Sequence, residues 1–360
     1  METASARINL TALQHNLSTI RQQAPASRLL AVIKANAYGH GLVPIARALD
    51  RADGFGVARV EEATTLRDAG IASPILLLEG VTDPSELETL GRHRIDLVVH
   101  CEEQLRMLEL SDATDAFKVW LKIDTGMHRL GWAADNVADV YQRLTAARSA
   151  AGSVVLMTHF ADAGDKASAT TEEQLSVFCK CARPYDCELS AANSAGLFGC
   201  PGSHLDWIRP GLALYGASPF YDDQAGSLGL RPVMTFQTGL IAVKSVPAGG
   251  RVGYGGTWTA QKETRIGIAA VGYGDGYLRA LTTDTPVLVN GQRTRILGCN
   301  SMDMMAIDLS DVAAAKIGDP VVLWGERLPV EEVSAHGGTI PYELLANVAE
   351  RVKREYVSDS

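Results

Sequence analysis

Eight short apolar runs recur through the first two-thirds of the chain, and this recurrence constrains the fold more than any other feature. The runs are LLAVI (29–33), FGVA (55–58), PILLL (74–78), IDLVV (95–99), KVWLKI (118–123), VVLMT (154–158), CELSA (187–191) and HLDWI (204–208). Amphipathic stretches such as EEATTLRDAG (61–70) and TEEQLSVFCKCARP (171–184) lie between them and favour helices. Apolar strands that alternate with helices indicate a buried parallel sheet. Eight such units predict an α/β fold that begins with a closed (β/α)8 barrel.

An open, doubly wound sheet is the alternative arrangement for the same alternation. That fold usually carries a glycine-rich dinucleotide loop directly after its first strand. In this chain LLAVI is followed by KANAYGHG instead. We therefore favour the barrel.

The pattern changes after about residue 228. Period-two or apolar runs now follow each other, separated by Gly, Pro and Asn-Gly: FQTGLIAVKSV (236–246), TRIGIAAVGYG (264–274), TPVLVNGQRTRILG (285–298) and DPVVLWG (319–325). Asn290-Gly291 predicts a hairpin, because a type I′ turn needs positive φ at both central residues. We expect a barrel domain over 1–228, a mainly β domain over 229–360, and a last helix over 343–356.

Composition narrows the class of partner. The formal net charge is −9 without long runs of one sign, which argues against nucleic acid as a ligand. No stretch reaches the roughly 18 apolar residues that a membrane span needs. The six cysteines include no C-x-x-C pair, so no metal site is predicted. These features favour a cytoplasmic enzyme that acts on a small molecule.

Polar residues follow the predicted strands at their carboxyl ends, where barrel enzymes place their active sites. They are Lys34, Arg59, Glu79, His100, Asp124, His159, Asn193 and Arg209. Lys34 is the most informative of them, because a lysine directly after an apolar strand lies at the mouth of a low-dielectric barrel. An amine there is suited to form a Schiff base. The alternative is an ordinary surface lysine whose ammonium reaches water.

The segment AVIKANAYGHG (31–41) resembles the cofactor-lysine segment of alanine racemases, and the resemblance continues along nearly the whole chain. Further matching segments are LKIDTGMHRLGW (121–132), ANSAG (192–196), IRPGLALYG (208–216), VGYGGTWTA (252–260), AAVGYGDGYLR (269–279), SMDMMAIDL (301–309) and PYELLANV (341–348). The resemblance implies a pyridoxal-phosphate-dependent interconversion of L- and D-alanine. It also implies a homodimer in which the two subunits share their active sites.

Roles for individual residues follow from the same resemblance. Lys34 holds the cofactor and acts as the base toward D-alanine, while Tyr254 of the second subunit acts toward L-alanine. Arg209 faces the pyridine nitrogen, Arg129 lies beside the phenolic oxygen and the substrate carboxylate, and His159 lies near the ring. The remaining cofactor-binding residues that the resemblance implies are Tyr38, Asn193, Ser194, Gly211, Leu212 and Tyr342.

The substrate side and one modification are also implied by the resemblance. Tyr273 falls where the family lines the substrate channel, and Met302 and Asp303 fall where it binds the carboxylate. Lys122 matches a lysine that is carbamylated in many relatives; a plain lysine is the alternative. The segment GCNSMD (298–303) departs from the family pattern, in which a basic residue and a small apolar one precede Ser-Met-Asp. Serine and other small amino acids therefore stay open as substrates.

Three other functions compete with this interpretation. A non-catalytic pyridoxal-phosphate carrier has the same type of barrel but lacks the second domain and its tyrosine. Amino-acid decarboxylases of this barrel type carry a late catalytic cysteine, and the surroundings of Cys299 differ from that motif. A serine hydrolase is suggested by ANSAG, yet the first glycine of G-x-S-x-G is absent. Whether the role is cell-wall supply or alanine catabolism is left open.

Overall fold

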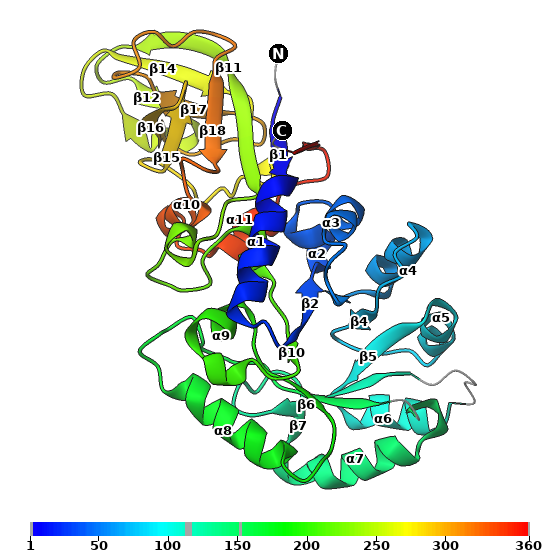
Figure 1. The fold of residues 1–360 in the computed structure, drawn as a ribbon. Coiled ribbons are helices and arrows are strands. Elements are labelled where there is room, and N and C mark those ends of the chain that lie inside the picture. Colours follow the sequence, from blue (N-terminus) through cyan, green and yellow to red (C-terminus); the bar gives the residue numbers. More distant parts are fainter. Residues whose placement is uncertain (1–2, 112–116, 151–152, 359–360) are drawn as a thin grey trace.

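The first domain is a closed barrel in the computed structural model, which describes residues 3–111, 117–150 and 153–358. Within these residues eight parallel strands form a ring, because β5 pairs with both β4 and β6 (Figure 1). The strands are β2 (Arg28–Val32), β3 (Gly54–Val57), β4 (Ile75–Leu77), β5 (Ile95–Val99), β6 (Val119–Asp124), β8 (Val154–Met157), β9 (Glu188–Ser190) and β10 (Trp207–Ile208). Each lies within or overlaps one of the eight predicted apolar runs, so the barrel is confirmed.

Helices follow the strands and cover the outside of the barrel (Figure 1). They are α1 (Leu10–Gln23), α3 (Leu42–Ala48), α4 (Val60–Asp68), α5 (Ser85–His93), α6 (Glu102–Glu109), α7 (Val137–Ala146), α8 (Thr170–Ala182) and α9 (Ser194–Gly199). The segment α2 (Lys34–Tyr38), directly after β2, is a single turn with left-handed backbone. Short elements complete the domain: β7 (Trp132–Ala133), η1 (Ala134–Asn136), η2 (Arg148–Ala150), η3 (Pro201–Ser203), η4 (Leu212–Tyr215) and η5 (Ala225–Leu228). The predicted helices at 61–70 and 171–184 correspond to α4 and α8.

Six of the eight barrel strands place large side chains inside the barrel. The interior cluster consists of Leu30, Leu76, Val98, Trp120, Val155, Met157 and Trp207. Trp120 and Trp207 pack with their ring centroids 5.5 Å apart. The barrel is therefore a packed core, and its chemistry is confined to the loops at the strand ends.

The second domain is an antiparallel β structure. Its strands are β11 (Met234–Val246), β12 (Arg251–Val252), β13 (Trp258–Thr259), β14 (Thr264–Ala269), β15 (Pro286–Val289), β16 (Gln292–Leu297), β17 (Met305–Asp308) and β18 (Pro320–Trp324), with η6 (Tyr254–Gly256) and η7 (Tyr273–Asp275) between them. The long β11 pairs with both β14 and β18. The predicted hairpin joins β15 to β16, and Asn290 and Gly291 have φ values of 51° and 74°.

Both ends of the chain contribute strands to the second sheet. β1 (Ser5–Asn9) pairs with β11 and, in parallel, with β19 (Lys353–Val357). Residues 5–9 thus belong to the second sheet, although the division at residue 228 assigns them to the first domain; that division stays a prediction. Their alternating burial is the period-two pattern of a half-buried strand.

The expected helix over 343–356 is wrong after residue 346. The chain instead forms α10 (Val330–His336) and the short α11 (Pro341–Ala346), and it then continues to β19. The sequence of this segment has a helical pattern, but tertiary pairing overrides it. The backbone groups of β19 form their hydrogen bonds with β1 instead of within a helix. As a result the last strand of the chain runs beside the first one (Figure 1).

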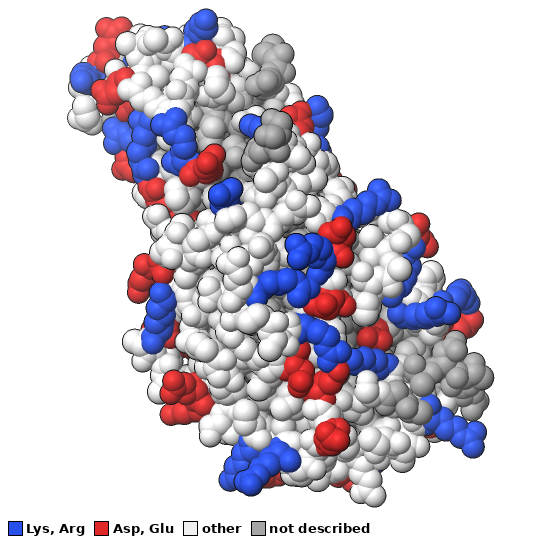
Figure 2. Space-filling view, viewed as in Figure 1, with Lys and Arg blue, Asp and Glu red and all other residues white. Residues whose placement is uncertain are grey.

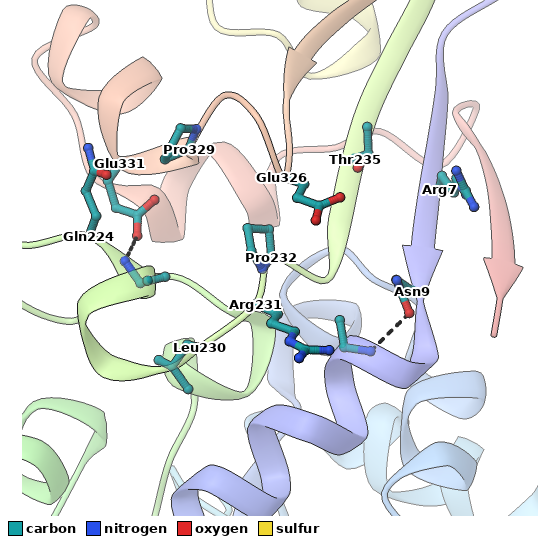
Figure 3. Close-up of a pocket in the computed structure, with 13 residues that line it drawn as sticks. Arg7, Asn9, Gln224, Leu230, Arg231, Pro232, Thr235, Glu326, Pro329 and Glu331 are labelled. Carbon is teal, nitrogen blue, oxygen red and sulfur yellow. Dashed lines mark hydrogen bonds between the residues drawn. The ribbon is translucent and has the colours of Figure 1, made fainter. Parts of the chain in front are cut away.

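Polar side chains fasten the two domains together. Asn16 on α1 donates to the Arg231 carbonyl at 2.8 Å and accepts from the Arg231 amide at 2.8 Å. Within the first domain it also donates to the Leu214 carbonyl at 3.0 Å. Glu331 on α10 accepts from the amides of Ser218 and Ala225 at 2.7 and 3.0 Å. The latter bond borders a cavity of about 590 Å³ between the domains (Figure 3).

The surface agrees with the dispersed charge of the sequence. On the face shown in Figure 2, lysine and arginine side chains are interspersed with aspartate and glutamate. Across the described ranges, no helix combines the length and apolar character that crossing a membrane requires.

Candidate active site

Lys34 begins a backbone turn of unusual hand at the end of β2. The four residues after it, Ala35 to Tyr38, have φ values of 52°, 54°, 55° and 50°, which is the left-handed region. Each L-residue in such a turn costs roughly 1–2 kcal/mol. Strain of this kind persists only where the surrounding structure enforces it, and it is concentrated at functional sites. The turn places Lys34 half-buried at the carboxyl end of the barrel.

Arg209 follows β10 and is only 4% exposed. Its guanidinium donates to the Ser190 hydroxyl at 2.5 Å and to the carbonyls of Thr158 and Ala191 at 2.6 and 3.2 Å. Burial lowers the pKa of Arg209 to about 10, so the group remains charged at neutral pH. A buried cation is thus held by neutral oxygen atoms rather than by an acid.

Other cationic groups face the same space. Lys122 on β6 is 7% exposed, and burial together with the charges of Arg209, Arg129 and Lys34 lowers its pKa to about 8. Burial, followed by the charges of these three residues and of Lys122 itself, lowers the pKa of His159 well below its usual value, so its ring is neutral. The Nδ1 atom of His159 lies 3.5 Å from the Arg209 guanidinium. This positive cluster favours an anionic ligand.

Hydroxyl and amide groups converge beside this cluster. Ser194, the first residue of α9, accepts from the amides of Gly211 and Ala213 at 2.9 and 3.2 Å. A Cβ atom added to Gly211 would lie 2.6 Å from the Tyr38 hydroxyl, so that hydroxyl fills the space of the missing side chain. Asn193 caps α9 by accepting from the amide of Gly196. The structure thus brings Tyr38, Asn193, Ser194, Gly211 and Leu212 together.

Tyr342 contributes to the same wall from the second domain. Its ring centroid lies 5.8 Å from that of Tyr38, which also stacks on Tyr215 at 4.8 Å. Both hydroxyls stay protonated, because burial raises the pKa of Tyr342 to about 12 and that of Tyr38 further still. These phenols can therefore donate hydrogen bonds to an anion.

Arg129 lies in the loop after β6. Asp124 shapes this loop by accepting from the amides of Gly126 and His128, both at 3.0 Å. The Arg129 side chain is exposed, and its charge acts on both Lys122 and His159. It therefore lies at the open side of the cationic cluster.

Apart from Tyr342, the predicted residues of the second domain lie in a separate place. Tyr254 is 73% exposed in the turn between β12 and β13, and Figure 1 shows β12 well separated from α2. Tyr273 lies beside the loop that carries Met302, since its amide donates to the Ser301 carbonyl at 3.1 Å. Asp303 pairs with Arg351 at 2.7 Å. The single chain thus groups Tyr273, Met302 and Asp303 but does not bring Tyr254 to Lys34.

In the described part of the chain, three of the polar residues that follow the barrel strands, Arg59, Glu79 and His100, contact one another and not the group around Lys34. Arg59 pairs with Glu79 at 3.0 Å, and the His100 ring lies 3.1 Å from the Glu79 carbonyl. The cavity in Figure 3 is also separate, because none of the predicted site residues lines it. The candidate site is therefore the group around Lys34 and Arg209.

Sequence reasoning missed the groups that support this site. Thr158 and Ser190 hold Arg209, while Tyr215 stacks on Tyr38 and on His40. His40 and Tyr215 stand inside the quoted segments AVIKANAYGHG and IRPGLALYG. Their position within a matching segment was a usable signal, whereas Thr158 and Ser190 carried none.

These features define a class of protein: a (β/α)8-barrel enzyme with a lysine and an anion-binding cradle at its mouth, followed by a β domain. Residues 8–219 match the alanine racemase N-terminal domain and residues 233–356 match the C-terminal domain of the same family. The chain is 50% identical to the alanine racemase of Vibrio cholerae over 356 residues, covering 99% of both chains. The chain therefore belongs to the alanine racemase family of isomerases.

Solved structures agree with this assignment. The biosynthetic alanine racemase of Pseudomonas aeruginosa is 43% identical, with a TM-score of 0.96 over 99% of this chain and all of the other. The alanine racemase of Bartonella henselae, solved with covalently bound pyridoxal phosphate, is 30% identical, with a TM-score of 0.89 over 99% of both chains. The barrel followed by a β domain is thus an arrangement that this chain shares with both of these alanine racemases.

Proposed function

We propose that this protein interconverts L- and D-alanine with pyridoxal phosphate bound at Lys34. The observation that carries the proposal is the position of Lys34: a lysine on a strained turn, between a cluster of cations and a cradle of hydroxyls and amides. Full-length identity of 50% to a curated alanine racemase supports alanine as the substrate.

The residues present fit this cofactor. An amine suits its carbonyl group, and hydroxyls with backbone amides suit its phosphate. The cradle of Tyr38, Ser194 and the 211–213 amides has this chemistry, and the absent Cβ of Gly211 leaves room for the Tyr38 hydroxyl within it. When bound, pyridoxal phosphate supplies an electron-withdrawing ring that makes the α-proton of an amino acid acidic enough to be removed.

Arg209 sets the electronic character of the site in this proposal. A guanidinium remains charged at neutral pH and only donates hydrogen bonds, so a ring nitrogen that faces it stays unprotonated. Neutral oxygens at Ser190, Thr158 and Ala191 fix its plane. A ring with an unprotonated nitrogen is a weaker electron acceptor, which limits side reactions such as transamination. His159 lies next to Arg209, and we assign it a place beside the ring.

Two bases on opposite faces exchange the α-proton. Lys34 takes or returns it on the face used by D-alanine, and the Tyr254 hydroxyl does so on the face used by L-alanine. Because Tyr254 is exposed and distant from Lys34 in its own chain, we propose that the site is completed by Tyr254 of a second copy in a homodimer.

The remaining predicted residues position the substrate. Arg129 is suited to bind its carboxylate, since a guanidinium is a fork of donors. From the partner subunit, Tyr273 is proposed to line the access path, and Met302 and Asp303 are proposed to lie at the substrate carboxylate. Carbamylation would turn the buried Lys122 into an anion that orients Arg129, and the pKa of about 8 leaves roughly a tenth of this amine neutral and reactive at pH 7. We propose a cytoplasmic role in supplying D-alanine to the cell wall or in alanine catabolism.

Incubation with L-alanine and pyridoxal phosphate tests the function. Chiral chromatography should reveal D-alanine with the native chain and none with Lys34→Ala. A Lys180→Ala control, which changes an exposed lysine on α8, should behave like the native chain. An active Lys34→Ala variant would refute the assignment of the lysine, and an inactive native chain would refute the activity.

A further inference from the structure

The left-handed turn after Lys34 must be stabilised by neighbouring groups, and the His40 side chain contacts it directly. The Nδ1 atom of His40 lies 2.8 Å from the Tyr38 carbonyl and 3.1 Å from the Ala37 carbonyl. Both neighbours are acceptors, so Nδ1 must carry the proton and donate. A single imidazole thereby satisfies carbonyl groups of two residues whose backbone is left-handed.

The His40 ring is fixed by its surroundings. It is fully buried and stacks on Tyr215 at 4.5 Å, which in turn stacks on Tyr38 at 4.8 Å. Burial and the nearby Arg354 charge lower the pKa of His40 to about 4, against the effect of its two carbonyl contacts. The ring is therefore neutral at physiological pH, with its one proton committed to the turn.

The last strand of the chain holds the same segment from the other side. Arg354 on β19 donates to the Gly39 carbonyl at 2.7 Å, and the Tyr356 hydroxyl donates to the His40 carbonyl at 3.1 Å. Tyr356 also fills the space beside Gly41, where an added Cβ would collide with its hydroxyl. Four successive carbonyl groups, from residue 37 to residue 40, are thus held by three side chains.

We propose that His40 is a positioning residue that, with Arg354 and Tyr356, locks the turn 35–38 and so sets the places of Lys34 and Tyr38. This lock links the C-terminal strand of the second domain to the lysine at the barrel mouth. The effect of this lock on catalysis rests on the proposed function of Lys34. The effect of the lock on the conformation of the turn does not depend on that function.

Two substitutions at His40 separate its donor from its bulk. In His40→Asn the amide nitrogen falls near the position of Nδ1 and keeps the donor, whereas in His40→Gln it falls near Nε2 and the donor is lost. The readout is hydrogen exchange, by mass spectrometry, of the full-length chain as isolated without added cofactor. The amides of Gly39 and Gly41, bonded to the carbonyls of Ala35 and Asn36, report on the turn.

His40→Gln should accelerate exchange in the 34–41 peptide about tenfold, the effect expected when hydrogen bonds to buried carbonyls are lost. Exchange in a β5 peptide should not change, and His40→Asn should restore most of the protection. The proposal would be overturned if the 34–41 peptide of His40→Gln exchanged at the same rate as in the native chain. It would also be overturned if exchange accelerated evenly over the whole barrel.

Tyr356→Phe provides a test that does not depend on folding of the His40 variants. It removes only the hydroxyl that bonds to the His40 carbonyl, and we expect about threefold faster exchange confined to 34–41. No change there would overturn the part of the lock assigned to β19. Because exchange is read without substrate or cofactor, a failure of the racemase proposal would appear only in the turnover assay.

Discussion

The Arg209 guanidinium donates a hydrogen bond of 2.5 Å to the Ser190 hydroxyl, and within the described residues no carboxylate pairs with it. Buried arginines are usually paired with acids, because an uncompensated charge is costly to bury. Here the charge is compensated only by a hydroxyl and carbonyl groups. The chain therefore keeps a cation at the barrel mouth. Because no carboxylate of the described residues pairs with it, its full charge is available to an anion or a ring nitrogen.

Arg209→Lys should therefore destabilise the protein. An ammonium cannot reach Ser190, Thr158 and Ala191 with the planar fork of a guanidinium, so buried acceptors lose their donors. We expect the free energy of unfolding in urea to fall by about 1–3 kcal/mol. Arg183→Lys, at an exposed arginine, should change it by less than about 0.5 kcal/mol. Equal effects of both substitutions would contradict the buried role.

Gly211→Ala should weaken the binding of pyridoxal phosphate. The new Cβ would lie 2.6 Å from the Tyr38 hydroxyl and must displace it. We expect the dissociation constant to rise roughly tenfold or more, as when a hydrogen bond to a charged group is lost. Gly226→Ala is the matched control, because its Cβ would meet no atom within 4 Å. If both variants titrate like the native chain, the cradle is not the phosphate site.

Mixing two inactive variants tests the shared site. Tyr254→Phe should fold normally, since the side chain is 73% exposed, yet lose about 10²- to 10⁴-fold in turnover as one base is removed. Mixed with Lys34→Ala under conditions that exchange subunits, it should recover roughly a quarter of the native sites, because each heterodimer contains one intact pair. A site within a single chain predicts no recovery. Tyr185→Phe, on the outside of the barrel, should remain active alone.

Stability should depend on pH through Lys122. Its pKa is about 8 in the folded chain, against a reference value of 10.5. Between these values the unfolded chain binds more protons, so stability rises with pH and the penalty of burying the ammonium is fully present below pH 8. Relative to Lys122→Met, the native chain should gain about 3 kcal/mol between pH 8 and 10.5 in CO2-free buffer. If the difference in unfolding free energy between the native chain and Lys122→Met did not change with pH, the Lys122 ammonium would be in a solvated environment.

Carbamylation of Lys122 has a separate signature. In labelled bicarbonate, carbon-13 NMR of the native chain should show a carbamate signal that Lys122→Arg lacks, because a guanidinium does not react. The signal should survive Lys180→Arg. Its absence from active native protein would exclude the modification and leave a plain buried lysine.

The barrel could be predicted because each strand is a continuous apolar run, and the hairpin because Asn290-Gly291 supplies two residues that tolerate positive φ. β1 and β19 were not predicted. They are short, and their strand character depends on pairing with each other across more than 340 residues. A local pattern cannot signal such a partner, so the end of the chain was interpreted as a helix.

The same limit applies to the site. Lys34 and Arg209 stood out because each follows an apolar strand, where a charge is conspicuous. Thr158 and Ser190 did not, because a hydroxyl in a strand carries no signal until its partner is known. The left-handed turn was also hidden, since Ala35 to Tyr38 include no glycine. Its hand is imposed by contacts from His40, Arg354 and Tyr356.

The most direct test of the account is to incubate the chain and pyridoxal phosphate with L-alanine in D2O and to separate the enantiomers by chiral chromatography with mass detection. We predict that D-alanine carrying one deuterium at Cα accumulates until both enantiomers are present in equal amounts, and that Lys34→Ala forms none. Absence of labelled D-alanine from the native chain, or its formation by the Lys34 variant, would contradict the central claim.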